Sequence, residues 1–143
     1  MCDMKCVLNT DVIGAALRIP SGDSAALLMA ARRGEFPMVA TVALVPEYEA
    51  TCSRTEVVLA SGLSTHQLDL FLDAVDAMAE PVETHSLWRP LLRDPADELV
   101  HEAAVNGKAA AIVTFNQRDF GAVPKQFGVE VLSPGTALRR IRP

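Results

Sequence analysis

Carboxylate and amide side chains follow several short apolar runs of this sequence, at the points where buried strands would end. They fall into four groups along the chain: Asn9 and Asp11, then Glu47, then Asp94 and Asp97, and last Asn116 and Asp119. In an open parallel α/β sheet, ligands bind outside the carboxyl ends of the strands, so polar residues just after strands are the first candidates for chemistry. We therefore expect the four groups to meet at one edge of a sheet.

Carboxylates gathered at one edge repel one another unless a cation lies between them. The chain offers no CxxC motif and no paired histidines beside these acids, because His66, His85 and His101 are far apart in the sequence. Such an oxygen-only ligand set suits Mg²⁺ or Mn²⁺ better than zinc. These ions polarise a phosphoryl oxygen and lower the pKa of bound water. The pattern therefore predicts hydrolysis of phosphodiester bonds with Mg²⁺ or Mn²⁺ as cofactor.

Each acid also has a purely structural interpretation. Asp94 and Asp97 can stabilise a helix N-terminus, where acidic side chains are favoured. Asp119 can form an Asx turn, and Glu47 can be a solvated residue in the first turn of a helix. The metal-site hypothesis therefore depends on the convergence of all four groups.

Strand-like and helical segments alternate along the chain, as in a parallel sheet covered by helices on both faces. We expect strands at residues 5–9, 36–42, 82–87, 110–114 and 129–132. We expect helices at residues 12–17, 24–33, 44–52, 64–79, 94–105 and 136–141, while residues 55–62 fit a helical turn or a loop. The predicted fold class is α/β, a three-layer, Rossmann-like α/β/α arrangement around a central, mainly parallel sheet.

Three local signals predict where elements begin and end. Asp23 or Ser24 is expected to cap the second helix, and Ser64 the helix that follows residue 63. Pro81 is expected to end that helix, because proline lacks the N–H that a helix interior needs. Residues 116–119 are expected to form a polar turn after a buried strand.

Composition narrows the protein class. The chain has 143 residues, 50% of them hydrophobic, which suits one domain, here placed at residues 4–143. A net charge of -5 argues against binding nucleic acid through bulk electrostatics, so any RNA contact must be local. Three cysteines without metal-ligand spacing indicate neither a disulfide framework nor a zinc site. With no apolar run near ~20 residues, we expect a cytoplasmic protein without a membrane partner.

Other nucleotide-handling classes lack their motifs. Neither GxGxxG nor GxxxxGK[ST] occurs, which argues against dinucleotide binding and against a P-loop. A phospho-acceptor receiver domain also gathers acids at strand ends, but it needs a lysine after a late strand, and Lys108 and Lys125 are poorly placed for that role.

Four motifs resemble those of the PIN domain family in order and spacing. They read LNTDV at residues 8–12, PEYE at 46–49, DPADE at 94–98 and IVTFNQRDF at 112–120. Residues 89–100 and 113–120 are similar to PIN-family toxins of bacterial toxin–antitoxin systems, the VapC-like proteins. The resemblance implies a metal-dependent endoribonuclease that cleaves RNA, is blocked by a cognate antitoxin and forms a homodimer.

The resemblance also assigns site residues. Glu47 matches the second acid of the family. Asp97 matches the third, with Asp94 beside it, and Asp119 the fourth, with Asn116 beside it.

The first acid departs from the family pattern, which reads Leu-Asp-Thr-Asn-Val. In this chain Asn9 and Asp11 have exchanged places. A strand that continued through residue 11 would point both side chains to one face, so Asp11 could replace the missing acid. A helix that began at Thr10 would weaken that replacement. Two functions therefore stay open: an active ribonuclease toxin, and a catalytically impaired PIN-like protein that binds RNA or an antitoxin.

Four more residues have secondary roles in these hypotheses. Thr10 and Thr114 can support the carboxylates through hydrogen bonds or can satisfy the backbone. Arg118 can contact a phosphate or form a surface ion pair. Trp88 is expected to pack against the body of the protein rather than stack on a base.

Overall fold

A computed structural model describes residues 3–85 and 91–142 of the chain. Within these residues one five-stranded sheet has the order β3-β2-β1-β4-β5, and every neighbouring pair is parallel. The strands are β1 Cys6–Leu8, β2 Met38–Thr41, β3 Ala79–Val82, β4 Ala111–Val113 and β5 Glu130–Leu132.

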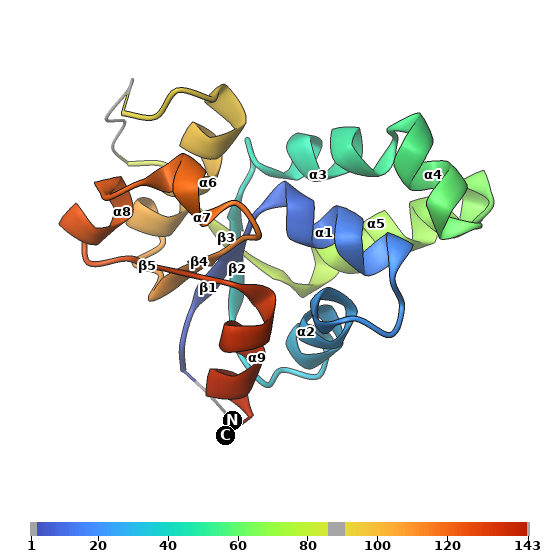
Figure 1. Ribbon diagram of the computed structural model, residues 1–143, viewed down its shortest axis with the longest axis horizontal. Coiled ribbons are helices and arrows are strands. Elements are labelled where there is room, and N and C mark those ends of the chain that lie inside the picture. Colours follow the sequence, from blue (N-terminus) through green and yellow to red (C-terminus); the bar gives the residue numbers. More distant parts are fainter. Residues whose placement is uncertain (1–2, 86–90, 143) are drawn as a thin grey trace.

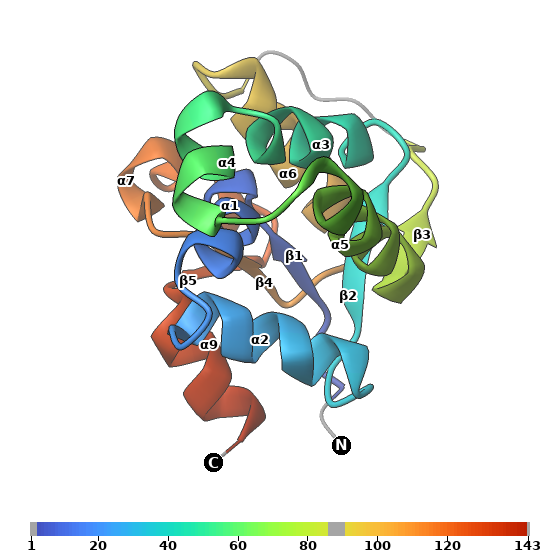
Figure 2. The same ribbon diagram turned by 90° about the vertical axis from the view of Figure 1, so that its right-hand side faces the viewer.

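Helices cover both faces of the sheet, as Figure 1 shows, with α1 to α5 on one side and α6 on the other. Their bounds are α1 Thr10–Arg18, α2 Asp23–Arg32, α3 Val45–Cys52, α4 Thr55–Ser61, α5 Thr65–Met78, α6 Pro95–Asn106, α7 Gln117–Phe120, α8 Val123–Gln126 and α9 Pro134–Ile141. α6 packs against β1, β2 and β4. After a quarter turn, Figure 2 shows α1, α2, α4 and α5 in front of the sheet. The α/β class and the three-layer arrangement are therefore confirmed.

The central strands are short and buried on both faces, as expected for a parallel sheet between helices. β1 and β4 are buried along their whole length. Their register pairs Leu8 with Val113, so both strands end at the same level. Asn9 continues the contact, because its N–H donates to the Val113 carbonyl at 2.9 Å. Residues 9 and 114 are thus neighbours at the carboxyl edge of the sheet.

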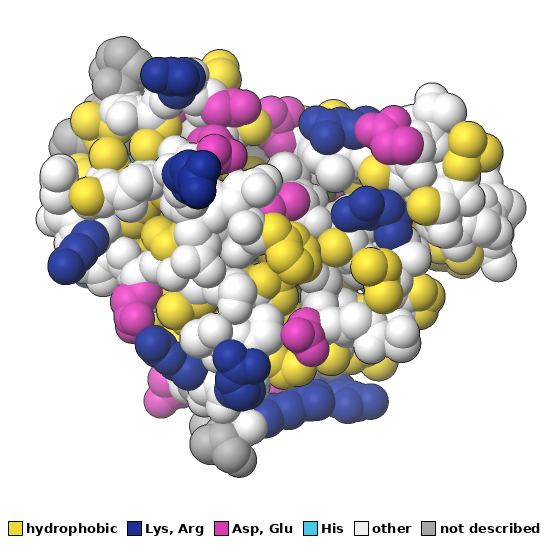
Figure 3. Space-filling view, viewed as in Figure 1, with side chains coloured by type: hydrophobic (Ala, Val, Ile, Leu, Met, Phe, Trp, Pro, Cys, Tyr) yellow, Lys and Arg dark blue, Asp and Glu magenta, His cyan; other side chains and the backbone are white. Residues whose placement is uncertain are grey.

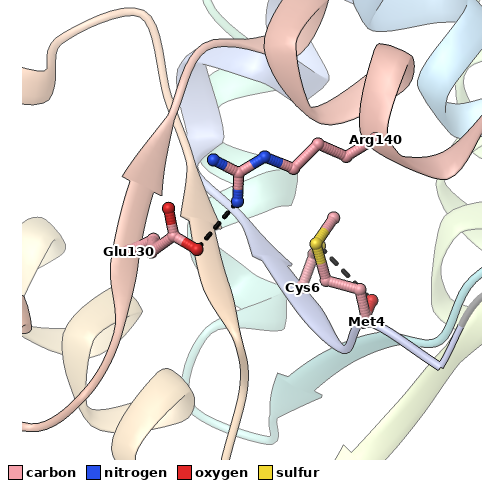
Figure 4. A network of polar contacts seen from close by, with 4 residues as sticks. All are labelled: Met4, Cys6, Glu130 and Arg140. Carbon is pink, nitrogen blue, oxygen red and sulfur yellow. Dashed lines mark hydrogen bonds and ion pairs between the residues drawn. The ribbon is translucent and has the colours of Figure 1, made fainter. Parts of the chain in front are cut away.

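Side chains near the opposite edge tie α9 to the rest of the fold. Arg140 forms an ion pair of 2.7 Å with Glu130 on β5, and Figure 4 shows this contact near the start of β1. In the same view the Cys6 thiol donates to the Met4 carbonyl at 3.5 Å. Another ion pair joins Arg142 to Glu35 at 2.6 Å.

The third strand differs from its prediction. It spans Ala79–Val82 and contains Pro81, which was expected to end the preceding helix. α5 instead ends at Met78. Proline is tolerated in β3 because this strand lies at the edge of the sheet and has a neighbour on one side only. Residues 83–85, which were also predicted as strand, form no strand, and residues 86–87 and Trp88 lie outside the described residues.

Several helix boundaries also differ from the sequence predictions. The N-cap of α2 is Gly22 rather than Asp23 or Ser24. The Ser24 hydroxyl is buried and has no hydrogen-bond partner in the described part of the chain. Residues 55–62, which the sequence left open, contain α4. Part of the predicted polar turn at 116–119 is the short helix α7, and α8 was not predicted. The capping role of Ser64 is confirmed, because its hydroxyl accepts from the Gln67 N–H at 3.2 Å.

In the described part of the chain, no single helix is long and apolar enough to cross a membrane. α1 and α2 meet those limits only when taken together, and they are bent by 105° where they meet.

Candidate active site

Asn9 connects the end of β1 with the start of α1. Its side-chain Oδ1 accepts a hydrogen bond from the Thr10 N–H at 2.9 Å, which is a helix N-cap interaction. Its Nδ2 donates to the Thr114 hydroxyl at 2.9 Å, and the residue is only 5% exposed. Both ends of the amide are thus engaged: the oxygen caps α1, and the nitrogen binds the residue that follows β4.

Asp11 reaches the end of β4 from the first turn of α1. Its Oδ2 accepts hydrogen bonds from the Thr114 hydroxyl and the Phe115 N–H, each at 3.0 Å, and from Asn116 Nδ2 at 3.4 Å. Its Oδ1 is buried without a partner among the described residues. Burial raises the pKa of the Asp11 carboxyl, and these hydrogen bonds partly oppose that rise.

These contacts show where the chain places Asp11, which has exchanged places with Asn9 relative to the family pattern. The helix begins at Thr10, so the strand does not continue through residue 11. Asp11 nevertheless turns toward the end of β4 rather than toward solvent. Asn9 and Asp11 are therefore joined through one shared neighbour, the Thr114 hydroxyl, which accepts from the first and donates to the second.

The start of α6 carries two more acids. Asp94 is the N-cap, and its Oδ1 accepts from the Ala96 N–H at 2.8 Å, as its structural interpretation predicted. Asp97 lies in the first turn and is partly buried. Its pKa is raised to about 6, first by burial and then by the negative charges of three other acids, which are Asp94, Asp119 and Asp11. Three separate segments of the chain thus bring carboxylates around Asp97.

A pocket of about 580 Å³ lies at this point. It is lined by three of the acids, two arginines and one proline, namely Asp94, Asp97, Asp119, Arg93, Arg118 and Pro95. In Figure 3, acidic and basic side chains lie next to each other over the region where α7 and the start of α6 are found. The structure therefore brings Asp94, Asp97 and Asp119 to one hollow, with Asp11 near enough to act on Asp97 through its charge.

Glu47 stays apart from this group in the contacts that the structure shows. It lies half-buried in the first turn of α3. The next residue, Tyr48, is buried and donates from its hydroxyl to the Leu8 carbonyl at 2.6 Å, which anchors α3 to the end of β1. Glu47 is not among the acids that raise the pKa of Asp97. Its role as a ligand stays a prediction.

The donor chemistry fits a hard cation such as Mg²⁺ or Mn²⁺. The acids around Asp97 offer oxygen ligands. The buried Oδ1 of Asp11 has no hydrogen-bond partner within the described residues, which leaves it free to bind a cation or a water molecule that the cation holds. Within residues 3–85 and 91–142, no three His, Cys, Asp or Glu side chains are placed so as to hold one metal ion. Mg²⁺ tolerates such a site, because it commonly keeps several waters and takes only one or two carboxylates from the protein.

Sequence reasoning missed three features of the site. Arg93 lies in the pocket, and Phe115 stands exposed beside it. Glu98 was expected only as a first-turn acid, but its side chain is buried and accepts hydrogen bonds from the backbone N–H groups of Leu91 and Leu92. Glu98 therefore holds the segment that leads into Arg93 and Asp94. Its position in the first turn of a predicted helix was the only available signal.

Comparisons with known proteins agree with this arrangement. The profile described as "PIN domain" matches residues 5–118. A search of curated proteins found no match. Among solved structures, a chain of the crystal structure of VapBC2 from Rickettsia felis bound to a DNA fragment from their promoter is similar in fold. Its TM-score is 0.58 at 14% identity, over 91% of this chain and 98% of that chain.

Proposed function

Because this chain belongs to the PIN domain family, we propose that it is an Mg²⁺- or Mn²⁺-dependent endoribonuclease and the toxin of a toxin–antitoxin pair. PIN domains are generally nucleases, and they typically use divalent metal ions. The choice of RNA as substrate and of these two ions as cofactor belongs to the proposal.

One observation carries the proposal, namely the crowding of carboxylates around Asp97. Three acids from three segments raise its pKa together with burial. Like charges gathered in a partly buried place are costly for the fold, and a structure retains such an arrangement when a cation or a reaction makes use of it. Asp97 and two of these acids, Asp94 and Asp119, line an open pocket large enough to admit a phosphodiester group.

The residues then have distinct roles. Asp97 and Asp119 hold the cation, and Asp94, Asn116, Glu47 and the first-motif residues Asn9 and Asp11 are candidates to complete its surroundings. When bound, the ion polarises the scissile phosphoryl group and supplies an activated water. Thr114 fixes the orientation of Asp11 through a hydrogen bond of 3.0 Å. Arg93 and Arg118 bring positive charge to a pocket that would otherwise repel a phosphate.

The toxin assignment draws on the structural neighbour, which is named as part of a VapBC2 complex. We propose that this chain likewise pairs with a cognate antitoxin, forms a homodimer and acts in the cytoplasm. Co-purification with the product of a small adjacent gene, followed by loss of RNA cleavage in the complex, would test the pairing.

A second function is favoured by the position of Asn9. Its amide is engaged by Thr10 and Thr114, and it contributes no charge where the family pattern has an aspartate. The chain would then be a catalytically impaired PIN-like protein that binds RNA or an antitoxin. Asn9→Asp separates the two functions: a gain in cleavage of tenfold or more, about 1.4 kcal/mol in the barrier, indicates impairment, and an equal rate indicates that Asp11 already serves.

The direct test is cleavage of a fluorescently labelled single-stranded RNA by the full chain. We expect cleavage with Mg²⁺ or Mn²⁺, none with excess EDTA, and a loss of about a hundredfold or more in Asp97→Asn. Asp69→Asn is the matched control, because Asp69 lies exposed on α5, away from the pocket. Cleavage by Asp97→Asn at the rate of the unmodified chain would refute the proposed site.

A further inference from the structure

Phe115 is exposed at the end of β4, next to the acids of the candidate site. The residue is 55% exposed, and it is the only aromatic one among the large hydrophobic residues that stand exposed in the described part of the chain. Its backbone is fixed, because its N–H donates to Asp11 Oδ2 at 3.0 Å. The structure thus holds the residue in place while leaving its ring in solvent.

The ring borders a second pocket that adjoins the acidic one. This hollow has a volume of about 470 Å³ and is lined by Phe115, Asn116, Gln117, Arg118 and Asp119. Arg118 and Asp119 line both pockets. A ligand that crosses from one hollow to the other would therefore pass Arg118, with the aromatic ring on one side and Asp97 on the other.

Among the described residues, Arg118 has no carboxylate as an ion-pair partner. In the described part of the chain the ion pairs are those of Arg140 and Arg142, and neither Arg118 nor Arg93 lies within ion-pair distance of a carboxylate. Both nevertheless line a pocket with Asp94, Asp97 and Asp119. A guanidinium group that is free in such a place can bind an external phosphate through two parallel hydrogen bonds.

We infer that this surface binds a single strand of nucleic acid, with one base stacked on the Phe115 ring and a neighbouring phosphate held by Arg118. An exposed aromatic ring beside a free arginine is the usual combination for binding unpaired bases and their backbone. The bases of a duplex are already stacked on each other, so the strand must be single. The identification of the strand as RNA rests on the proposed function.

This local binding mode also fits the charge of the protein. With a net charge of -5, the protein as a whole does not attract a phosphate backbone. Affinity must then come from a few contacts, of which aromatic stacking is independent of salt and the arginine contact is not. The two residues can therefore be distinguished by experiment.

The experiment measures binding by fluorescence anisotropy, using the full chain, a labelled single-stranded RNA of mixed sequence and EDTA to prevent cleavage, over a series of salt concentrations. The variants are Phe115→Leu, Phe115→Trp and Arg118→Gln. Phe115→Leu keeps apolar volume but removes the aromatic face. Arg32→Gln is the matched control for Arg118→Gln, because Arg32 lies exposed on α2 and outside both pockets.

We expect Phe115→Leu to weaken binding about fivefold or more at every salt concentration, and Phe115→Trp to preserve it. Arg118→Gln should weaken binding and lower the slope of log K against log salt by about 0.7, whereas Arg32→Gln should leave both unchanged. Single-stranded DNA of the same sequence should bind similarly, because neither contact reads the 2′-hydroxyl. Equal affinity of Phe115→Leu and the unmodified chain would overturn the inference, as would tighter binding of duplex RNA than of the single strand.

Because binding is measured without metal, its result is independent of cleavage. A chain that binds as expected but does not cut RNA with Mg²⁺ or Mn²⁺ would overturn the proposed function and support the inference. If the unmodified chain cuts RNA but Phe115→Leu binds RNA as tightly as the unmodified chain, the proposed function is supported and the inference is overturned.

Discussion

The hydroxyl of Thr114 donates a hydrogen bond of 3.0 Å to Oδ2 of Asp11, although the two residues are 103 positions apart in the sequence. The same hydroxyl accepts from Asn9 Nδ2 at 2.9 Å and from the Asn116 N–H at 3.0 Å. One buried side chain thus orders three groups at the carboxyl edge of β1 and β4. The arrangement of the first and last motifs depends on it.

Thr114→Val should therefore destabilise the fold by about 1–3 kcal/mol, since it keeps the shape but removes the partner of buried polar groups. Thr114→Ser retains the hydroxyl and should lose less. Urea unfolding of the three proteins without metal measures the difference. A valine variant as stable as the unmodified chain would mean that the network contributes nothing to folding.

Asn9→Asp should lower the metal-free stability by about 1 kcal/mol or more, because a carboxylate at this position has no hydrogen to donate and the Thr114 proton is already given to Asp11. The added charge should also strengthen metal binding, since it gives the cation a further anionic neighbour. In EDTA, Asn9→Asp should therefore unfold at a lower temperature than the unmodified chain, and Mn²⁺ should remove this difference. Thermal unfolding of both proteins under the two conditions measures it.

Gln126→Glu is the matched control for that change. It makes the same replacement of an amide by a carboxylate at an exposed position of α8. We expect it to respond to Mn²⁺ as the unmodified chain does. If Asn9→Asp remains less stable than the unmodified chain at saturating Mn²⁺, no cation binds close to this residue.

Asp97→Asn should stabilise the metal-free protein above neutral pH. The folded-state pKa of Asp97 is raised from 3.8 to about 6, so the fold favours the protonated carboxyl. The stability that the protonated Asp97 carboxyl contributes is fully present below pH 3.8, and it is lost as the pH rises through about 6. Asparagine resembles the protonated form at every pH. After allowance for solvent screening at this partly exposed site, we expect a gain of about 1 kcal/mol at about pH 8.

Urea unfolding in EDTA from acid to alkaline pH measures this gain, which should disappear toward pH 3.8. Asp23→Asn is the matched control, because Asp23 is an exposed acid in the first turn of α2, as Asp97 is an acid in the first turn of α6. Removal of its favourable interaction with the helix N-terminus should lower stability slightly. A loss of stability in Asp97→Asn at alkaline pH would show that the neighbouring acids do not strain the site.

The sequence predicts the sheet edge better than it predicts the site itself. The apolar run that forms β4 and the acids that open α6 are local signals, and the structure has both where they were expected. Pro81 misled the prediction because the position of a strand within the sheet is not encoded locally. The distance from Glu47 to Asp97 and the rotation of Asp11 depend on packing between helices. Phe115 was missed because an apolar residue after a strand gives no sign that its ring stays exposed.

Metal binding should weaken as the pH falls through about 6, because the cation competes with the proton for the Asp97 carboxylate. At about pH 8, Mn²⁺ at tenfold excess over its dissociation constant should stabilise the fold by about 1.4 kcal/mol, which raises the melting temperature by roughly 3–6 °C. At about pH 5 the same concentration should have little effect, since most of Asp97 is protonated. Asp97→Asn should show a small rise with no dependence on pH. Thermal unfolding over this pH range measures the shift, and a rise of equal size at both pH values in the unmodified chain would mean that the ion binds elsewhere.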